Sequence, residues 1–208
     1  MIRVAIAEDH TLVREALKHL LSQSGRVQVV GEATNGREAV ELVQKVRPDV
    51  LLLDISMPEK DGLQASMEIA AQGGPTRVLM LSMHTDDSYA VRAIRAGAAG
   101  YIQKTAKIDE LINAIETVQA GKRVVPAGVE DVLEKGNADL GPAQVLSQRE
   151  FQVMGYLAAG MTNREIARLL SISVKTVDTH RGHVLKKLKL RNNSDITRFA
   201  IQHGLLQM

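Results

Sequence analysis

Apolar and polar residues follow two alternating patterns over the first 121 residues. Short β-branched and apolar runs, bounded by turn-forming residues, predict strands at 3–7, 27–33, 50–54, 76–81 and 100–103. Between these runs the apolar residues recur every three to four positions, which predicts helices at 11–22, 36–45, 62–72, 86–96 and 107–120. Strict alternation of strand and helix predicts a parallel sheet with helices on both faces. We therefore expect a doubly wound, five-stranded α/β domain over residues 1–121.

Residues 122–145 break this pattern. They contain two prolines and three glycines and no long periodic run, although residues 129–135 could form one or two helical turns. We interpret the segment as a linker between two domains.

The remaining residues, 146–208, have helical periodicity throughout. Ser147 with Glu150, and Thr162 with Glu165, have the spacing of capping boxes, which predicts helices at 148–159 and 163–170, with Gly160 ending the first. Further helices are expected at 174–188 and 194–203. Because the second and third helices are separated by only a few residues, the pattern predicts a small all-α domain with a helix-turn-helix.

Composition excludes several classes of protein. Hydrophobic residues make up 45% and charged residues 24% of the 208 residues, as in an ordinary globular chain. The chain has no cysteine, which excludes disulfides and thiolate metal sites, and only 2% aromatic residues, which argues against a stacking platform for single-stranded nucleic acid. No apolar run approaches the ~20 residues of a membrane span. We expect a cytoplasmic protein with no membrane partner.

Charge divides the chain in the same way as the hydrophobic pattern. Residues 1–121 carry 13 basic and 16 acidic side chains, whereas residues 146–208 carry 10 basic and 4 acidic ones. The two parts therefore have net charges of −3 and +6. A small basic domain is a candidate for binding a polyanion such as DNA.

The ends of the predicted strands carry the groups that could do chemistry. Glu8 and Asp9 follow the first strand, Asp54 ends the third, Ser82 follows the fourth and Lys104 follows the fifth. In an open parallel sheet these carboxyl ends meet at one edge, where ligands bind. Clustered carboxylates repel unless a cation joins them, and oxygen ligands of this kind suit Mg²⁺. An ionised aspartate is also able to form a covalent bond to a phosphoryl group.

These residues resemble the receiver domain of response regulators. The resemblance rests on Glu8-Asp9, on Asp54 within Leu53-Asp54-Ile55-Ser56-Met57-Pro58, and on Gly62, Ser82, Tyr101 and Lys104. The rear part resembles a LuxR-type helix-turn-helix through the segments 146–150, 160–167 and 173–180. Together they resemble a NarL/FixJ-type response regulator over nearly the whole chain outside the linker. The fold that this implies is a flavodoxin-like receiver domain followed by a DNA-binding domain.

The resemblance also implies roles for the residues at the sheet edge. Asp54 would accept phosphate from a cognate histidine kinase, and Mg²⁺ would be held by Glu8, Asp9, Asp54 and the backbone carbonyl of Ser56. Ser82 and Lys104 would contact the phosphoryl group. Tyr101 would be the aromatic residue whose side chain moves inward together with Ser82. Ser56 and His84 stand at positions that tune the lifetime of the phosphate in such proteins.

One face of the helix at 174–188 is polar and is the candidate DNA-reading surface. Its members share a stripe at helical spacing, with a small residue in the middle suited to close approach in a major groove, and they are Lys175, Asp178, Thr179, Gly182 and Lys186. Thr179 could contact a thymine methyl and Asp178 could accept from a cytosine amine. Lys187 and Lys189 are candidate phosphate contacts.

The expected function is therefore a transcription regulator that binds double-stranded DNA as a homodimer when phosphorylated. Ile196, Phe199 and Ala200 on the last helix are candidates for an apolar dimer surface, although at least part of that face must be core. Two alternatives have other chemistry: a Mg²⁺-dependent phosphohydrolase with an aspartyl-phosphate intermediate, and an adaptor whose rear domain binds protein. Ser56 counts against the first, because haloacid-dehalogenase-type enzymes usually have a second aspartate at that position.

Overall fold

A computed structural model describes the chain except for residues 84–86, 135–144, 204 and 206–208. The chain forms two compact units, Met1–Lys135 and Gly136–Met208. Each unit is described by itself below. Among the described residues, no helix is both long and apolar enough to cross a membrane.

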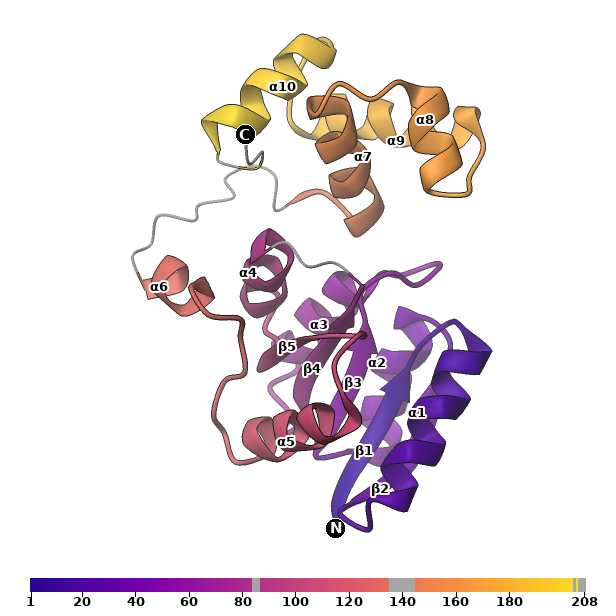
Figure 1. Ribbon diagram of the computed structural model, residues 1–208, viewed down its shortest axis with the longest axis vertical. Helices are drawn as coiled ribbons and strands as arrows, with labels where there is room; N and C mark the ends of the chain where they lie inside the picture. The colour runs from indigo at the N-terminus through magenta and orange to yellow at the C-terminus, as the bar shows by residue number, and fades with distance from the viewer. Residues whose placement is uncertain (84–86, 135–144, 204, 206–208) are drawn as a thin grey trace. The chain divides into compact units, whose positions relative to one another are not determined.

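The first unit is built on a five-stranded parallel sheet with the order β2-β1-β3-β4-β5 (Figure 1). The strands are β1 (Ile2–Ala7), β2 (Val27–Ala33), β3 (Val50–Asp54), β4 (Arg77–Ser82) and β5 (Gly100–Gln103). The helices are α1 (Thr11–Gln23), α2 (Gly36–Val46), α3 (Gly62–Ala71), α4 (Asp87–Arg95) and α5 (Ile108–Gln119). This confirms the predicted doubly wound α/β fold, with element ends that differ by no more than one residue.

Burial explains why these segments become strands. All five residues of the central strand β3 are buried, because helices cover both of its faces. On one face, alternate residues of β1, β3 and β4 pack with α1 and α5 in one apolar cluster that includes Ile6, Leu52, Leu81 and Ile115. The chain order reverses between β1 and β3, so the crevice beyond their carboxyl ends is the place where a ligand is expected in such a sheet.

The loop after β3 closes tightly onto the sheet. The backbone N–H of Gly62 donates to the carbonyl of Ile55 at 2.9 Å. A Cβ atom at Gly62 would overlap the carbonyl oxygen of Asp54, so only glycine allows this approach. The glycine therefore fixes the loop that leaves Asp54 and starts α3.

The segment that follows α5 differs from the predicted linker. Val124 forms a parallel bridge with Gly100, and its carbonyl accepts from the N–H of Tyr101 at 2.7 Å. The short helix α6 (Val129–Glu134) then contacts α4. The first part of the predicted 122–145 linker thus belongs to the first unit, because it satisfies the outer edge of β5. Most of the remainder, residues 135–144, lies outside the described residues.

The second unit is all helical in the part that is described. It contains α7 (Gln148–Ala158), α8 (Asn163–Leu169), α9 (Val174–Lys187) and α10 (Asn193–Gln202). Both predicted capping boxes are present, at Ser147 and Thr162. Gly160 follows the end of α7 with a φ of 87°, a conformation that favours glycine. The turn from α8 to α9 is closed by the N–H of Ile172, which donates to the carbonyl of Ala167 at 3.0 Å.

The last helix packs inward, against our expectation for its apolar face. Ile196, Phe199 and Ala200 are buried within their own domain, where α10 lies against α7. They form part of the small core, and so these three side chains do not provide the open dimer surface for which they were candidates. The apolar side of α10 is needed to close the core of this small unit.

Candidate functional site

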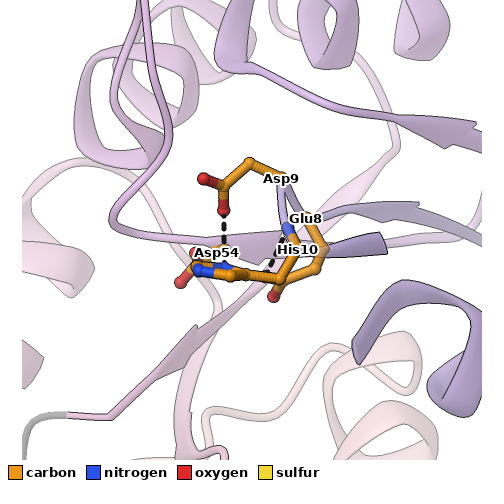
Figure 2. Close-up of side chains that lie close together, drawn as sticks. All are labelled: Glu8, Asp9, His10 and Asp54. Atoms are coloured by element: carbon orange, nitrogen blue, oxygen red, sulfur yellow. Dashed lines mark hydrogen bonds and ion pairs between the residues drawn. The ribbon is translucent and has the colours of Figure 1, made fainter. Parts of the chain in front are cut away.

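The carboxyl ends of three strands bring acidic and basic side chains into one cluster, which we call the pocket below. Asp54 ends β3 and is only 2% exposed, while Glu8 and Asp9 follow β1. Figure 2 shows that the side chains of these three residues and His10 gather at one place on the sheet edge. The topology therefore brings together the carboxylates that the sequence assigned to this edge.

Lys104 joins two of these carboxylates. Its Nζ lies 2.7 Å from Glu8 Oε2 and 3.0 Å from Asp54 Oδ1. Burial lowers the pKa of Lys104, but the carboxylates of Asp54 and Glu8 outweigh it and hold that pKa above its ordinary value. The backbone N–H of Lys104 donates to the carbonyl of Ser82 at 2.8 Å, so the lysine is fixed to the end of β4.

Asp54 is held in an environment that disfavours its charge. Burial raises the pKa of this carboxyl above its ordinary value, and the nearby charge of Glu8 acts in the same direction. Lys104 and a backbone hydrogen bond from Ser56 oppose the shift without cancelling it. An additional positive charge at the pocket would stabilise the ionised, nucleophilic form of Asp54.

The pocket has donor atoms that suit a hard cation. One ligand atom from each of Glu8, Asp9, His10 and Asp54 lies within 4.8 Å of the others. Asp54 Oδ2 is buried and has no hydrogen-bond partner among the described residues, which is costly unless a cation or another donor meets it. Carboxylate oxygens are the ligands that Mg²⁺ prefers, so the residues present fit a magnesium site.

His10 also belongs to this cluster, although the sequence pattern did not single it out. Its Nδ1 lies 3.0 Å from both Glu8 Oε1 and Asp9 Oδ1, and the ring is 68% exposed. The hydrogen bond to Glu8, and then the charge of Asp9, raise the pKa of His10. The sequence feature that could have indicated His10 is its position directly after the two acids and directly before α1. Imidazole is a poor ligand for Mg²⁺, so we regard His10 as an ion-pair partner of the acids.

The other residues that the sequence suggested for this sheet edge are Ser82, Tyr101, Ser56 and His84. Ser82 ends β4 and Tyr101 lies on β5, and both are buried. Ser56 is exposed in the loop after β3. His84 lies outside the described residues.

The candidate DNA-reading surface is the exposed side of α9. All five members of the predicted stripe are exposed, whereas Val177 and Val184 on the opposite side are buried. α9 packs on α7 and α8 through that buried side. A Cβ atom at Gly182 would meet nothing within 4 Å, so the packing of the domain does not require a glycine there.

Two of the expected phosphate contacts have different surroundings. Lys189 is exposed, as expected, but Lys187 Nζ lies 2.6 Å from Oε2 of the buried Glu150. Glu150 also completes the capping box of α7 and faces Nδ1 of His183 at 3.3 Å. Lys187 therefore neutralises an internal carboxylate, a role that no local sequence pattern indicates.

Family comparisons agree with this division of the molecule. The model described as "Response regulator receiver domain" matches residues 4–116, more than half of the chain. The model described as "Bacterial regulatory proteins, luxR family" matches residues 144–200. The chain belongs to the LuxR family of two-component response regulators. It is a transcription regulator with a DNA-binding domain rather than an enzyme, which excludes the phosphohydrolase alternative.

Individual relatives of this response regulator cover one or both units. The oxygen regulatory protein NreC of Staphylococcus aureus is 35% identical over 216 residues, covering 99% of this chain and 100% of the relative. The receiver domain of the putative response regulator NarL from Mycobacterium tuberculosis is 40% identical with a TM-score of 0.57, covering 58% of this chain and 98% of that one. The response regulator RcsB, in a complex with DNA, is 26% identical with a TM-score of 0.59 and covers 97% and 98% of the two chains.

Proposed function

We propose that Asp54 is the phosphoacceptor through which a histidine kinase controls this regulator. The observation that carries the proposal is the ion pair of Lys104 with Asp54 and Glu8 in a buried pocket at the sheet edge. In the proposed step, a carboxylate oxygen of Asp54 attacks the phosphorus of the phosphohistidine. The P–N bond breaks, the imidazole leaves with the electron pair and takes up a proton, and an acyl phosphate remains.

The other groups of the pocket prepare Asp54 for this step. Mg²⁺, held by Glu8, Asp9, Asp54 and the Ser56 carbonyl, would supply positive charge for the phosphoryl oxygens. Lys104 would transfer its contact from the Asp54 carboxylate to the phosphoryl group. The hydroxyl of Ser82 would donate to another phosphoryl oxygen, and the side chain of Tyr101 would move inward together with Ser82. A local change of charge would therefore alter β4 and β5 together.

For the second unit, we propose sequence-specific binding of α9 in the major groove of double-stranded DNA. Phosphorylation would favour a homodimer that reads two related half-sites. The proposal is supported by the exposed stripe of Lys175, Asp178, Thr179, Gly182 and Lys186, and by the relative RcsB, whose complex with DNA is known. Chromosomal DNA as a partner also favours a cytoplasmic location.

Mass spectrometry tests the phosphoacceptor. Incubated with Mg²⁺ and acetyl phosphate, the parent should gain one phosphoryl group, and Asp54→Asn should gain none. Asp109→Asn, which changes an exposed aspartate on α5, should behave as the parent. The adduct should be more stable to acid than to base, as expected for an acyl phosphate. A stoichiometric phosphoryl group on Asp54→Asn would overturn the assignment.

A further inference from the structure

The first turn of α8 contacts the DNA-reading surface of α9. Asn163, the first residue of α8, donates from Nδ2 to Asp178 Oδ1 at 2.7 Å. Asp178 is exposed and Asn163 is half-buried, so the contact lies at the surface of the domain. Asn163 was not among the residues that the sequence suggested, and Asp178 is the only acid of the stripe.

This contact distinguishes the two oxygens of Asp178. A carboxylate only accepts hydrogen bonds, and Oδ1 already accepts one from Asn163. Among the described residues, Oδ2 has no hydrogen-bond partner. The amide therefore restrains the orientation of the carboxylate and leaves Oδ2 as the oxygen without a protein donor, on an exposed side chain.

The same contact is not needed to hold α8 and α9 together. Ile166, Ala167 and Val177 are buried between the helices, and the turn is closed by the Ile172 to Ala167 backbone hydrogen bond. A hydrogen bond between side chains at the surface adds little to such packing. Its consequence is for the orientation of Asp178 rather than for the fold.

The chemistry of an oriented acceptor selects one base. In the major groove only cytosine and adenine present an exocyclic amine that donates. In adenine the amine lies beside N7, an acceptor that repels a carboxylate, whereas cytosine has no acceptor beside its amine on this edge. An acid in the groove is also repelled by the phosphates, so it is tolerated only where it meets a donor.

We propose that Asn163 is a positioning residue for base reading, which orients Asp178 so that Oδ2 accepts from N4 of a cytosine at one position of each half-site. This inference rests on the proposed function, because it requires α9 to enter the major groove. It assigns a specificity role to a residue of α8, outside the helix that reads the bases.

Site selection with the full-length, phosphorylated protein tests the proposal. The preferred duplex is first selected from a random library with the parent. The Asp178-dependent position is then the base pair at which Asp178→Ala loses discrimination. There the parent should prefer cytosine by about tenfold, and Asn163→Ala should lose most of this preference, since a hydrogen bond to a charged group is worth about that factor or more. Affinity for a scrambled duplex should stay within about twofold of the parent.

A double-mutant comparison separates positioning from any general effect. In the Asp178→Ala background, Asn163→Ala should change nothing further, because Asn163 acts only through the carboxylate. Asn163→Asp keeps a favourable residue in the first turn of α8 but places a second carboxylate against Asp178, and it should abolish the preference as well. Asn193→Ala is the matched control. Asn193 is also the first residue of a helix and accepts from Arg181 of α9 at 2.6 Å, yet its loss should leave the cytosine preference intact.

The outcomes distinguish this inference from the proposed function. If the parent enriches no sequence, the proposed function fails and the inference with it. If the parent enriches a motif and Asn163→Ala keeps the full cytosine preference, only the inference is overturned. It is also overturned if Asn163→Ala changes the preference equally in the Asp178→Ala background.

Discussion

The receiver pocket and the exposed face of α9 use charge in opposite ways. In the pocket, Glu8, Asp54 and Lys104 are largely removed from water and each charge depends on its neighbours. On α9, the charged side chains of the stripe are exposed, and Asp178 has one hydrogen bond, from Asn163. Buried charges interact strongly and respond to one added group, whereas exposed charges are screened and act additively. The pocket is therefore suited to switching and the helix face to reading many bases and phosphates.

The largest effect on phosphorylation-dependent DNA binding should follow from removing the charge of Lys104. We expect Lys104→Met, which keeps the aliphatic stem, to be phosphorylated by acetyl phosphate but to gain no DNA affinity from it, because the link from the phosphoryl group to β4 and β5 is gone. DNA affinity of fully phosphorylated protein, verified by mass, is the measurement. Lys107→Met alters an exposed lysine three residues later and should retain the gain. A normal gain in Lys104→Met would show that the signal takes another route.

The reading face should lose specificity rather than all binding when Thr179 is changed. Its hydroxyl donates to the carbonyl of Lys175 at 3.0 Å, so the methyl group remains for a thymine. Thr179→Val, which keeps the methyl, should preserve the base preference, and Thr179→Ser should lose about 1–3 kcal/mol of it. Affinities for specific and scrambled duplexes measure the effect. Equal losses on both duplexes for Thr179→Ser would mean that this residue reads no base.

Lys187 and Lys189 test the contrast between buried and exposed charges, because Lys187 pairs with a buried acid whereas Lys189 faces solvent. Lys187→Met should destabilise the second unit by about 1–3 kcal/mol, since the buried Glu150 loses a charged donor. Although burial acts to raise it, the pKa of Glu150 lies below its ordinary value of 4.5, mainly because Lys187 donates to it. Glu150 thus contributes stability above that value, and the contribution is lost as the pH falls through the lower folded-state pKa. Denaturant unfolding of the full chain should therefore show the largest difference between Lys187→Met and the parent near neutral pH, and a smaller one in acid.

The exposed Lys189 should instead affect binding to every sequence alike. Lys189→Ala should lower the slope of log affinity against log salt concentration by about 0.9, as expected for one lost phosphate contact. A salt titration on specific and scrambled duplexes measures it. An unchanged slope for Lys189→Ala, or a reduced slope for Lys187→Met, would reverse the roles that we assign to the two lysines.

The smallest expected change is a stabilisation. Gly182→Ala should raise the free energy of unfolding by about 0.5–1 kcal/mol, because alanine favours a helix interior and the added Cβ meets open space. The same variant should bind DNA more weakly if the helix approaches the groove closely at this point. Gain of stability with unchanged DNA affinity would show that the glycine serves no close approach.

Local patterns made much of the fold and most of the pocket predictable, with His10 as the member that was missed. The buried run of β3, the alternation with helices and the two capping boxes depend on neighbours in sequence, and all were expected correctly. Asp54 could be assigned to the sheet edge because parallel strands end on the same side.

Contacts between distant side chains could not be predicted in this way. The pairs of Lys187 with Glu150 and Asn163 with Asp178 join residues on different helices, and their distances depend on how those helices pack. The apolar side of α10 predicts that something covers it, but not that the cover is α7 of the same domain.

The bridge between Val124 and Gly100 has a practical consequence for how the chain is divided. β5 is the last strand of its sheet, and an open strand edge is a template for pairing with other molecules and for aggregation. Val124 occupies this edge by binding the N–H of Tyr101. A receiver fragment cut after residue 121 would leave that N–H open, and we expect it to self-associate in size-exclusion chromatography, whereas a fragment extended through α6 should stay monodisperse.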